Sequence, residues 1–98
     1  MREVLISGFV LDKIDELESY LIDELKLSEE AVLRRSARMR KFIHSLGVSV
    51  DFPICRFKMW RMFGYRCIVF EKDWIFACEI FTDGIIVRDM SHSSLLYE

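Results

Sequence analysis

Apolar residues recur at intervals of three and four early in the chain, the spacing of a helix that buries one face. This stripe consists of Ile14, Leu17, Leu21 and Leu25. Asp12 lies just before it and is a suitable N-cap residue, so a helix is predicted over residues 13–25. The preceding run Val4–Val10 mixes apolar and small residues and is predicted to be a strand.

A second helix is predicted after a short link. Ser28 is a suitable N-cap residue, and Glu29 and Glu30 fall in the first turn, where the helix dipole favours acidic side chains. The core-facing stripe consists of Val32, Ser36, Met39, Ile43 and Leu46. Gly47 suits the position after the helix, which is therefore predicted over residues 29–46. The short link predicts that the two helices pack as an antiparallel hairpin.

From Asp51 onward the apolar period changes to two, and Pro53 opposes a helix. Strands rich in β-branched and aromatic residues are predicted over residues 55–63, 64–71, 74–81 and 85–90. Lys72-Asp73 and Asp83-Gly84 are predicted as two-residue hairpin turns. The resulting class is α+β: an N-terminal strand, a helical hairpin, then a three- to four-stranded antiparallel sheet with the helices on one face. Residues 1–98 are predicted to form a single domain.

Two-residue turns would place three charged side chains in one row across the sheet. Arg66 would face Glu79, and Glu79 would face Arg88. Such a row is either a cross-strand ion ladder, worth roughly 0.2–1 kcal/mol per pair, or an anion site whose two guanidinium groups are held by the carboxylate. The opposite face, which includes Cys67 opposite Cys78, is more apolar and is predicted to pack on the helices.

The net charge of −2 conceals an uneven distribution along the chain. Residues 1–30 carry nine acidic and three basic groups, residues 31–66 carry nine basic groups and one acid, and residues 67–98 carry six acids and two basic groups. Two interpretations stay open. The acidic first helix neutralises the basic second one, or the basic middle section binds an acidic partner, either nucleic acid or an acidic peptide.

Composition narrows the function classes. The chain contains no Asn and no Gln, which excludes N-glycosylation sites and the amide side chains that usually read adenine. Three cysteines without a Cys-x-x-Cys pair predict reduced, buried thiols in a cytoplasmic protein. No signal peptide and no membrane span is expected. The apolar share of 52% exceeds what one helix-covered face needs, so a second face is expected to be covered by a partner.

The order of elements resembles the RelE/ParE superfamily, the toxins of bacterial type II toxin–antitoxin pairs. The segment Gly64-Tyr65-Arg66-Cys67-Ile68-Val69-Phe70 resembles the Gly-Tyr-Arg entry to that family's central strand. The ending, with His92 and then Tyr97-Glu98 after an apolar strand, is also similar. The resemblance implies a toxin that acts on translation or on DNA gyrase and is neutralised by a small antitoxin. The alternative is a non-toxic protein-interaction domain of the same fold.

The resemblance also implies roles for particular residues. In a ribosome-dependent endoribonuclease, Arg66 and Arg61 would stabilise charge on the scissile phosphate, and His92 or Tyr97 would carry a proton or stack on a base. Four further residues are candidates for binding RNA or a partner: Arg56, Lys58, Glu79 and Arg88. In this sequence Arg56 and Lys58 lie one position away from the family's paired lysines, and Ser93 replaces the Arg after the late His. No metal and no cofactor is expected, and whether the chain is an enzyme stays open.

Overall fold

The computed structural model describes residues 2–48 and 52–96. The elements in chain order are β1 (Glu3–Ile6), α1 (Gly8–Asp23), α2 (Glu29–Ser45), η1 (Leu46–Val48), α3 (Lys58–Met62), β2 (Arg66–Phe70), β3 (Trp74–Ile80), β4 (Gly84–His92) and η2 (Ser93–Leu95). The fold is α+β, as predicted: a strand, a helical hairpin and a sheet whose last three strands follow one another.

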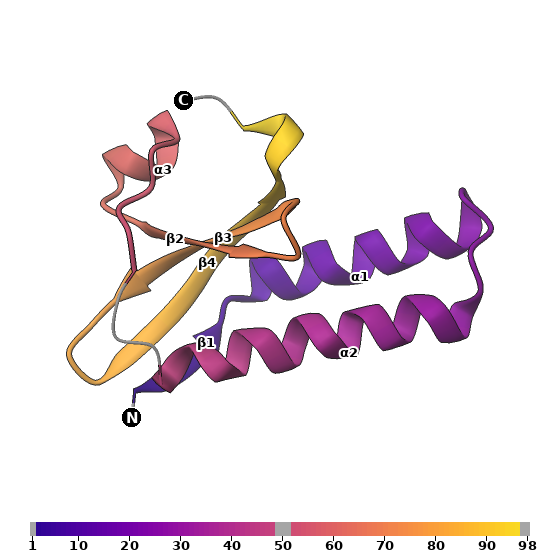
Figure 1. Cartoon of the computed structure of the whole chain (residues 1–98), viewed down its shortest axis with the longest axis horizontal. Helices are drawn as coiled ribbons and strands as arrows, with labels where there is room; N and C mark the ends of the chain where they lie inside the picture. Colours follow the sequence, from indigo (N-terminus) through magenta and orange to yellow (C-terminus); the bar gives the residue numbers. More distant parts are fainter. Residues whose placement is uncertain (1, 49–51, 97–98) are drawn as a thin grey trace.

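The sheet has four strands in the order β1-β4-β3-β2 and is mixed, not antiparallel throughout as predicted. β1 pairs with β4 in parallel, whereas β4 with β3 and β3 with β2 are antiparallel. In Figure 1 the antiparallel helices α1 and α2 lie side by side on one face of the sheet, and their far ends extend beyond it. The short helix α3 lies on the opposite face. Elements from both ends of the chain therefore build one unit.

The first helix begins earlier than predicted. Ser7, not Asp12, is its N-cap, and the Oγ of Ser7 accepts the N–H of Val10 at 3.3 Å. The predicted strand over residues 4–10 is correspondingly shortened to β1. Val10 is fully buried beneath the sheet as a helical residue, because its position continues the spacing of Ile14. Tertiary burial therefore decided where the strand ends and the helix begins.

The second helix agrees closely with its prediction. Ser28 caps it, with its Oγ accepting the N–H of Ala31 at 3.1 Å, and every residue of the predicted stripe is buried. Beyond it the chain continues through η1 rather than ending at a glycine cap. A side chain at Gly47 would clash with the backbone carbonyl oxygen of Arg2, whose own N–H donates to the oxygen of Gly47 at 3.0 Å. Glycine is required there because two backbones approach closely.

Both hairpin turns are longer than predicted. Phe70 pairs with Trp74, so three residues form the first turn, with Glu71 at φ 48° and Lys72 at φ 70°. Ile80 pairs with Ile85, leaving a four-residue loop. A one-residue change of register moves every side chain to the other face. The register observed in β2 and β3 places Phe70 and Phe76 against the helices, where the sheet is most deeply buried.

A β-bulge at Ala77/Cys78 shifts the register again between β3 and β4. Cys67 lies opposite Ala77, and Cys78 lies opposite Arg66, so the predicted Cys67–Cys78 pairing is wrong. The core under the helices includes Ile14, Met39, Ile43, Phe76, Cys78, Ile85 and Val87. Cys78 belongs to this core and is a free thiol. The register of the strands and the bulge together determine which strand residues face the helices and which face the opposite side of the sheet.

The outer face of the sheet is covered in part by this chain itself. Residues 55–63 do not form the predicted strand; they form the approach to α3 and α3 itself. A second core lies beneath this segment and contains Cys55, Phe57, Trp60, Ile75 and Ala77. Part of the high apolar content is therefore used internally, and the expectation that this face stays wholly open to a partner is wrong.

A disulfide ties this cover to the sheet. Cys55 and Cys67 are bonded, so the prediction of reduced thiols is wrong for these two residues. The chain around Cys55 runs beside β2: the N–H of Cys55 donates to Tyr65 O and the N–H of Cys67 donates to Pro53 O, both at 3.0 Å. The twelve-residue separation gave no signal, because only the return of the chain past α3 brings the two residues together.

Candidate functional site

A polar cleft of about 500 Å³ contains Arg66, the residue that the sequence singled out first. Arg66 begins β2 and shares the cleft lining with Arg2 and Glu79. The Nη1 of Arg66 donates to the backbone oxygen of Phe52 at 3.2 Å, which holds the guanidinium at the cleft wall. Two guanidinium groups beside one carboxylate give the cleft the chemistry of an anion site.

The predicted row of three charges is present only in part. Nε of Arg88 donates to Oε1 of Glu79 at 2.8 Å, a pair that is about two-fifths exposed on both sides. Arg66 does not face Glu79; it pairs across the sheet with Cys78. Across the sheet Glu79 pairs with Ile86, and Arg88 lies at the bulge between the partners of Ala77 and Cys78. Arg88 therefore neutralises Glu79, and this leaves the cleft more positive.

Within residues 2–48 and 52–96, the candidate catalytic residues do not converge. Arg66 pairs opposite Cys78 and His92 pairs opposite Trp74, four steps along β3, a separation of roughly 13 Å along the strand. His92 is already engaged, because its ring packs on Trp74 with centroids 5.4 Å apart and its Nδ1 accepts the N–H of Ser94 at 3.2 Å. Arg61 lies exposed on α3. Tyr97 lies outside the described residues.

The two remaining basic candidates lie on the outer face, around α3. Arg56 precedes the helix, with its guanidinium carbon 5.4 Å from the centroid of the Phe57 ring. Lys58 is the first residue of α3 and lines a cavity beside it. Neither residue lines the Arg66 cleft. Of the candidates, Arg66 and Glu79 line that cleft, whereas His92 and Lys58 line cavities on a second surface. The second surface was not predicted from the sequence.

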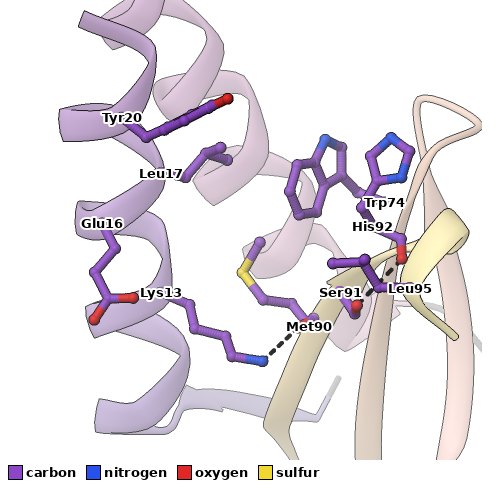
Figure 2. Close-up of a pocket in the computed structure, with 9 residues that line it drawn as sticks. All are labelled: Lys13, Glu16, Leu17, Tyr20, Trp74, Met90, Ser91, His92 and Leu95. Atoms are coloured by element: carbon purple, nitrogen blue, oxygen red, sulfur yellow. Dashed lines mark hydrogen bonds between the residues drawn. The ribbon is translucent and has the colours of Figure 1, made fainter. Parts of the chain in front are cut away.

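That second surface is a groove made of two adjoining cavities, called here the α1–α3 groove. The first cavity, about 270 Å³, lies between α1 and the ends of β3 and β4. Figure 2 shows Leu17 and Tyr20 projecting from α1 toward Trp74, with His92 and Leu95 on the far side. The residues from α1 are spaced three and four apart and form a stripe beside the buried positions Val10, Ile14 and Leu21. Leu17, predicted to belong to the core stripe, lines the cavity instead. This spacing along α1 is the feature of the sequence from which the cavity could have been predicted.

The second cavity of the groove, about 650 Å³, lies beside α3. It is lined mostly by apolar side chains, among them Phe57, Met59, Trp60, Met62 and Leu96. Lys13, Ser91 and Leu95 line both cavities and so join them. The groove draws on α1, α3, β4 and η2, which are distant in the sequence.

Asp89 organises the junction of the two cavities. Its Oδ1 accepts from Nζ of Lys13 at 2.8 Å, and its Oδ2 accepts from Nε1 of Trp60 at 3.1 Å. One carboxylate therefore connects α1, β4 and α3. Because both carboxylate oxygens are used within the fold, Asp89 positions the groove walls rather than offering a binding group.

The free thiol of Cys78 is not part of either surface. Burial raises the pKa of Cys78 from 9.0 to about 12, because the core disfavours the charged thiolate. Such a thiol is inert near neutral pH and is a packing group. Among residues 2–48 and 52–96, no group of three or more His, Cys, Asp or Glu side chains could hold a metal ion.

No protein family and no curated protein matches this sequence. No helix within the described residues is both long and apolar enough to cross a membrane.

Proposed function

We propose that this chain is the toxin component of a type II toxin–antitoxin pair, acting in the cytoplasm and neutralised by a small antitoxin protein. The observation that carries the proposal is the layout of the chain. An N-terminal strand and a helical hairpin precede three antiparallel strands, and Arg66 opens the first of these three in a polar cleft. This is the arrangement that the Gly64-Tyr65-Arg66 resemblance implies.

The geometry favours a toxin that acts by binding over one that cleaves RNA. Cleavage by a 2′-hydroxyl needs an acid, a base and cations around one phosphate. Arg66 and His92 lie at different ends of the sheet, and His92 is held by Trp74 and Ser94. DNA gyrase is therefore the favoured target. The Arg66 cleft supplies positive charge and the α1–α3 groove supplies apolar surface for such contacts.

The alternative is a non-toxic interaction domain of the same fold. It is favoured by one specific observation, the exposed apolar groove, because exposed apolar surface of this kind typically marks a protein interface. The groove fits either function, so the two differ only in what expression of the chain does to a cell.

The test is inducible expression in a bacterial host, with and without the product of the adjacent reading frame. The expected result is growth arrest with loss of DNA supercoiling, relieved when the neighbouring protein is co-expressed. New mRNA ends within coding regions would instead support the ribonuclease. Unchanged growth in every arm would contradict both toxin mechanisms and leave the interaction domain.

A further inference from the structure

The disulfide lies directly beside the Arg66 cleft. Cys67 follows Arg66 in β2 and is bonded to Cys55, which belongs to the segment that runs along the edge of this strand. Ile54, the neighbour of Cys55, pairs with Arg66 across this edge. The Nη1 of Arg66 donates to the backbone oxygen of Phe52, which comes just before the same segment. The redox state of the cysteine pair is therefore connected to the cleft through the backbone.

Residues 53–55, called here the edge segment, are held weakly apart from the disulfide. The two backbone hydrogen bonds described above attach the segment to β2. Pro53 and Ile54 are exposed, and Cys55 is the buried member of the three. Ordering the backbone of three residues costs more free energy than two such hydrogen bonds contribute. The covalent bond therefore decides whether the edge segment stays on the strand.

The flanks of the edge segment have anchors of their own. Phe52 belongs to the core beneath the helices and Phe57 to the second core, and each is 7% exposed. Loss of the disulfide therefore frees the edge segment without unfolding the sheet. The carbonyl that holds Arg66 belongs to the peptide that joins Phe52 to Pro53. This carbonyl turns away from the guanidinium when the segment moves.

We infer that the Cys55–Cys67 pair is a redox switch that controls the Arg66 cleft. In the oxidised chain the edge segment is fixed and the guanidinium of Arg66 is held in place. In the reduced chain the segment leaves β2, Arg66 loses its tether, and the cleft binds anions more weakly, because the side chain must be ordered on binding. The inference rests on the proposed function in that this cleft is a surface that the toxin would use, and it adds the regulation of that surface.

The switch operates by thiol–disulfide exchange with a dithiol reductant. Cys55 is 1% exposed and Cys67 is partly buried, so a thiolate of the reductant attacks the Sγ of Cys67, and the sulfur of Cys55 leaves as a thiolate. The second thiol of the reductant then attacks the mixed disulfide and releases Cys67. Two electrons and two protons pass to the cysteine pair, and the reductant becomes a disulfide. The reverse exchange restores the bond.

The test compares the whole chain in its oxidised form with the chain reduced by dithiothreitol. Reduction should speed hydrogen exchange of the Cys55 and Cys67 amides, followed by NMR, by about tenfold or more and leave exchange in α2 unchanged. Titration with inorganic phosphate should show binding weakened by about two- to tenfold, the effect of ordering one long side chain.

Three variants serve as controls. Cys55→Ala/Cys67→Ala should resemble the reduced chain under both conditions and should not respond to dithiothreitol. Cys78→Ala retains the disulfide, so it should respond as the natural sequence does. Arg66→Ala should abolish phosphate binding in both redox states, which locates the probe in the cleft.

The inference would be overturned by unchanged amide exchange at Cys55 and Cys67 after reduction. Equally faster exchange in α2 would also overturn it, because the whole chain would then be unfolding. Phosphate binding that is absent, equal in both redox states or independent of Arg66 would do the same.

The growth assay separates this inference from the proposed function. A chain that is toxic and is neutralised, and that remains unchanged in both respects in the Cys55→Ala/Cys67→Ala variant, retains the function and loses the switch. A non-toxic chain in which reduction alters both amide exchange and phosphate binding retains the switch and loses the toxin.

Discussion

Lys13 and Asp89 form an ion pair that joins α1 to β4, with Nζ 2.8 Å from Oδ1, although 76 positions separate them in the chain. The other oxygen of Asp89 accepts from Nε1 of Trp60. The hairpin layer and the α3 layer are thus connected through one carboxylate at the sheet edge.

Replacing Asp89 should therefore destabilise the fold. Asp89→Asn leaves the ammonium of Lys13 without its counter-charge, and we expect a loss of about 1–3 kcal/mol in the free energy of unfolding, measured by urea titration. The control is Glu30→Gln, which breaks the exposed Arg34–Glu30 pair and should change the free energy by less than about 0.5 kcal/mol. Equal effects from the two substitutions would contradict the organising role of Asp89.

The Cys55–Cys67 disulfide should stabilise the cover formed by α3. Closing a loop across a twelve-residue separation is worth about 2–4 kcal/mol, because it restricts the unfolded chain. Adding dithiothreitol should lower the unfolding free energy of the natural sequence by about that amount. It should not affect the Cys55→Ala/Cys67→Ala double variant.

The cytoplasm is reducing, so the proposed function requires that the fold survive this loss. Thiol titration of protein denatured immediately after lysis counts the free cysteines. Three thiols would mean that the pair is reduced in the cell, and one would mean that it is oxidised. Collapse of the fold on reduction would contradict a cytoplasmic site of action.

Burial of Cys78 predicts a particular dependence of stability on alkaline pH. The pKa of the thiol is about 12 in the folded protein and 9.0 when unperturbed. Above pH 9 the unfolded chain releases this proton and the folded chain keeps it. The contribution of the protonated Cys78 thiol to the free energy of unfolding is therefore fully present below pH 9. It is lost as pH rises toward 12, by about 1.4 kcal/mol per pH unit. Cys78→Ala should remove this part of the slope in denaturant titrations at successive pH values.

Reactivity offers an independent measurement of the same thiol. In the oxidised native protein at pH 8, a thiol reagent should label no cysteine among the described residues, and in urea it should label Cys78. Rapid labelling of the native protein would show that the core around β3 opens readily.

The first hairpin turn should be improved by glycine. Lys72 has φ 70°, a left-handed conformation that costs a side chain about 1–2 kcal/mol and costs glycine little. Glycine also has greater entropy in the unfolded chain, which offsets part of this gain. Lys72→Gly should therefore raise the free energy of unfolding by about 0.5–1 kcal/mol, and the melting temperature should rise with it. Asp73→Gly is the control, because Asp73 is not among the residues with positive φ, and it should give no such gain.

Features that depend on nearby residues were predictable. The stripe of α2, its Ser28 cap and the order of helices and strands follow from spacing and from side chains within a few positions. The class of fold follows as well, since a helical hairpin next to alternating strands has few ways to bury both apolar faces. That Arg66 belongs to a strand was also predictable, whereas its role stays a prediction.

What the tertiary structure decided is which residues meet. Adding one residue to a turn changes which side chains of a strand face the core, and local composition does not show that extra residue. The Arg88–Glu79 ion pair likewise forms although Glu79 pairs with Ile86 across the sheet. Residues 55–63 have the composition of a strand, yet they close a second core in which Cys55 reaches Cys67. The groove is likewise built by α1, β4 and α3 together. Only burial of apolar surface between distant segments selects these arrangements, because local propensity does not distinguish them.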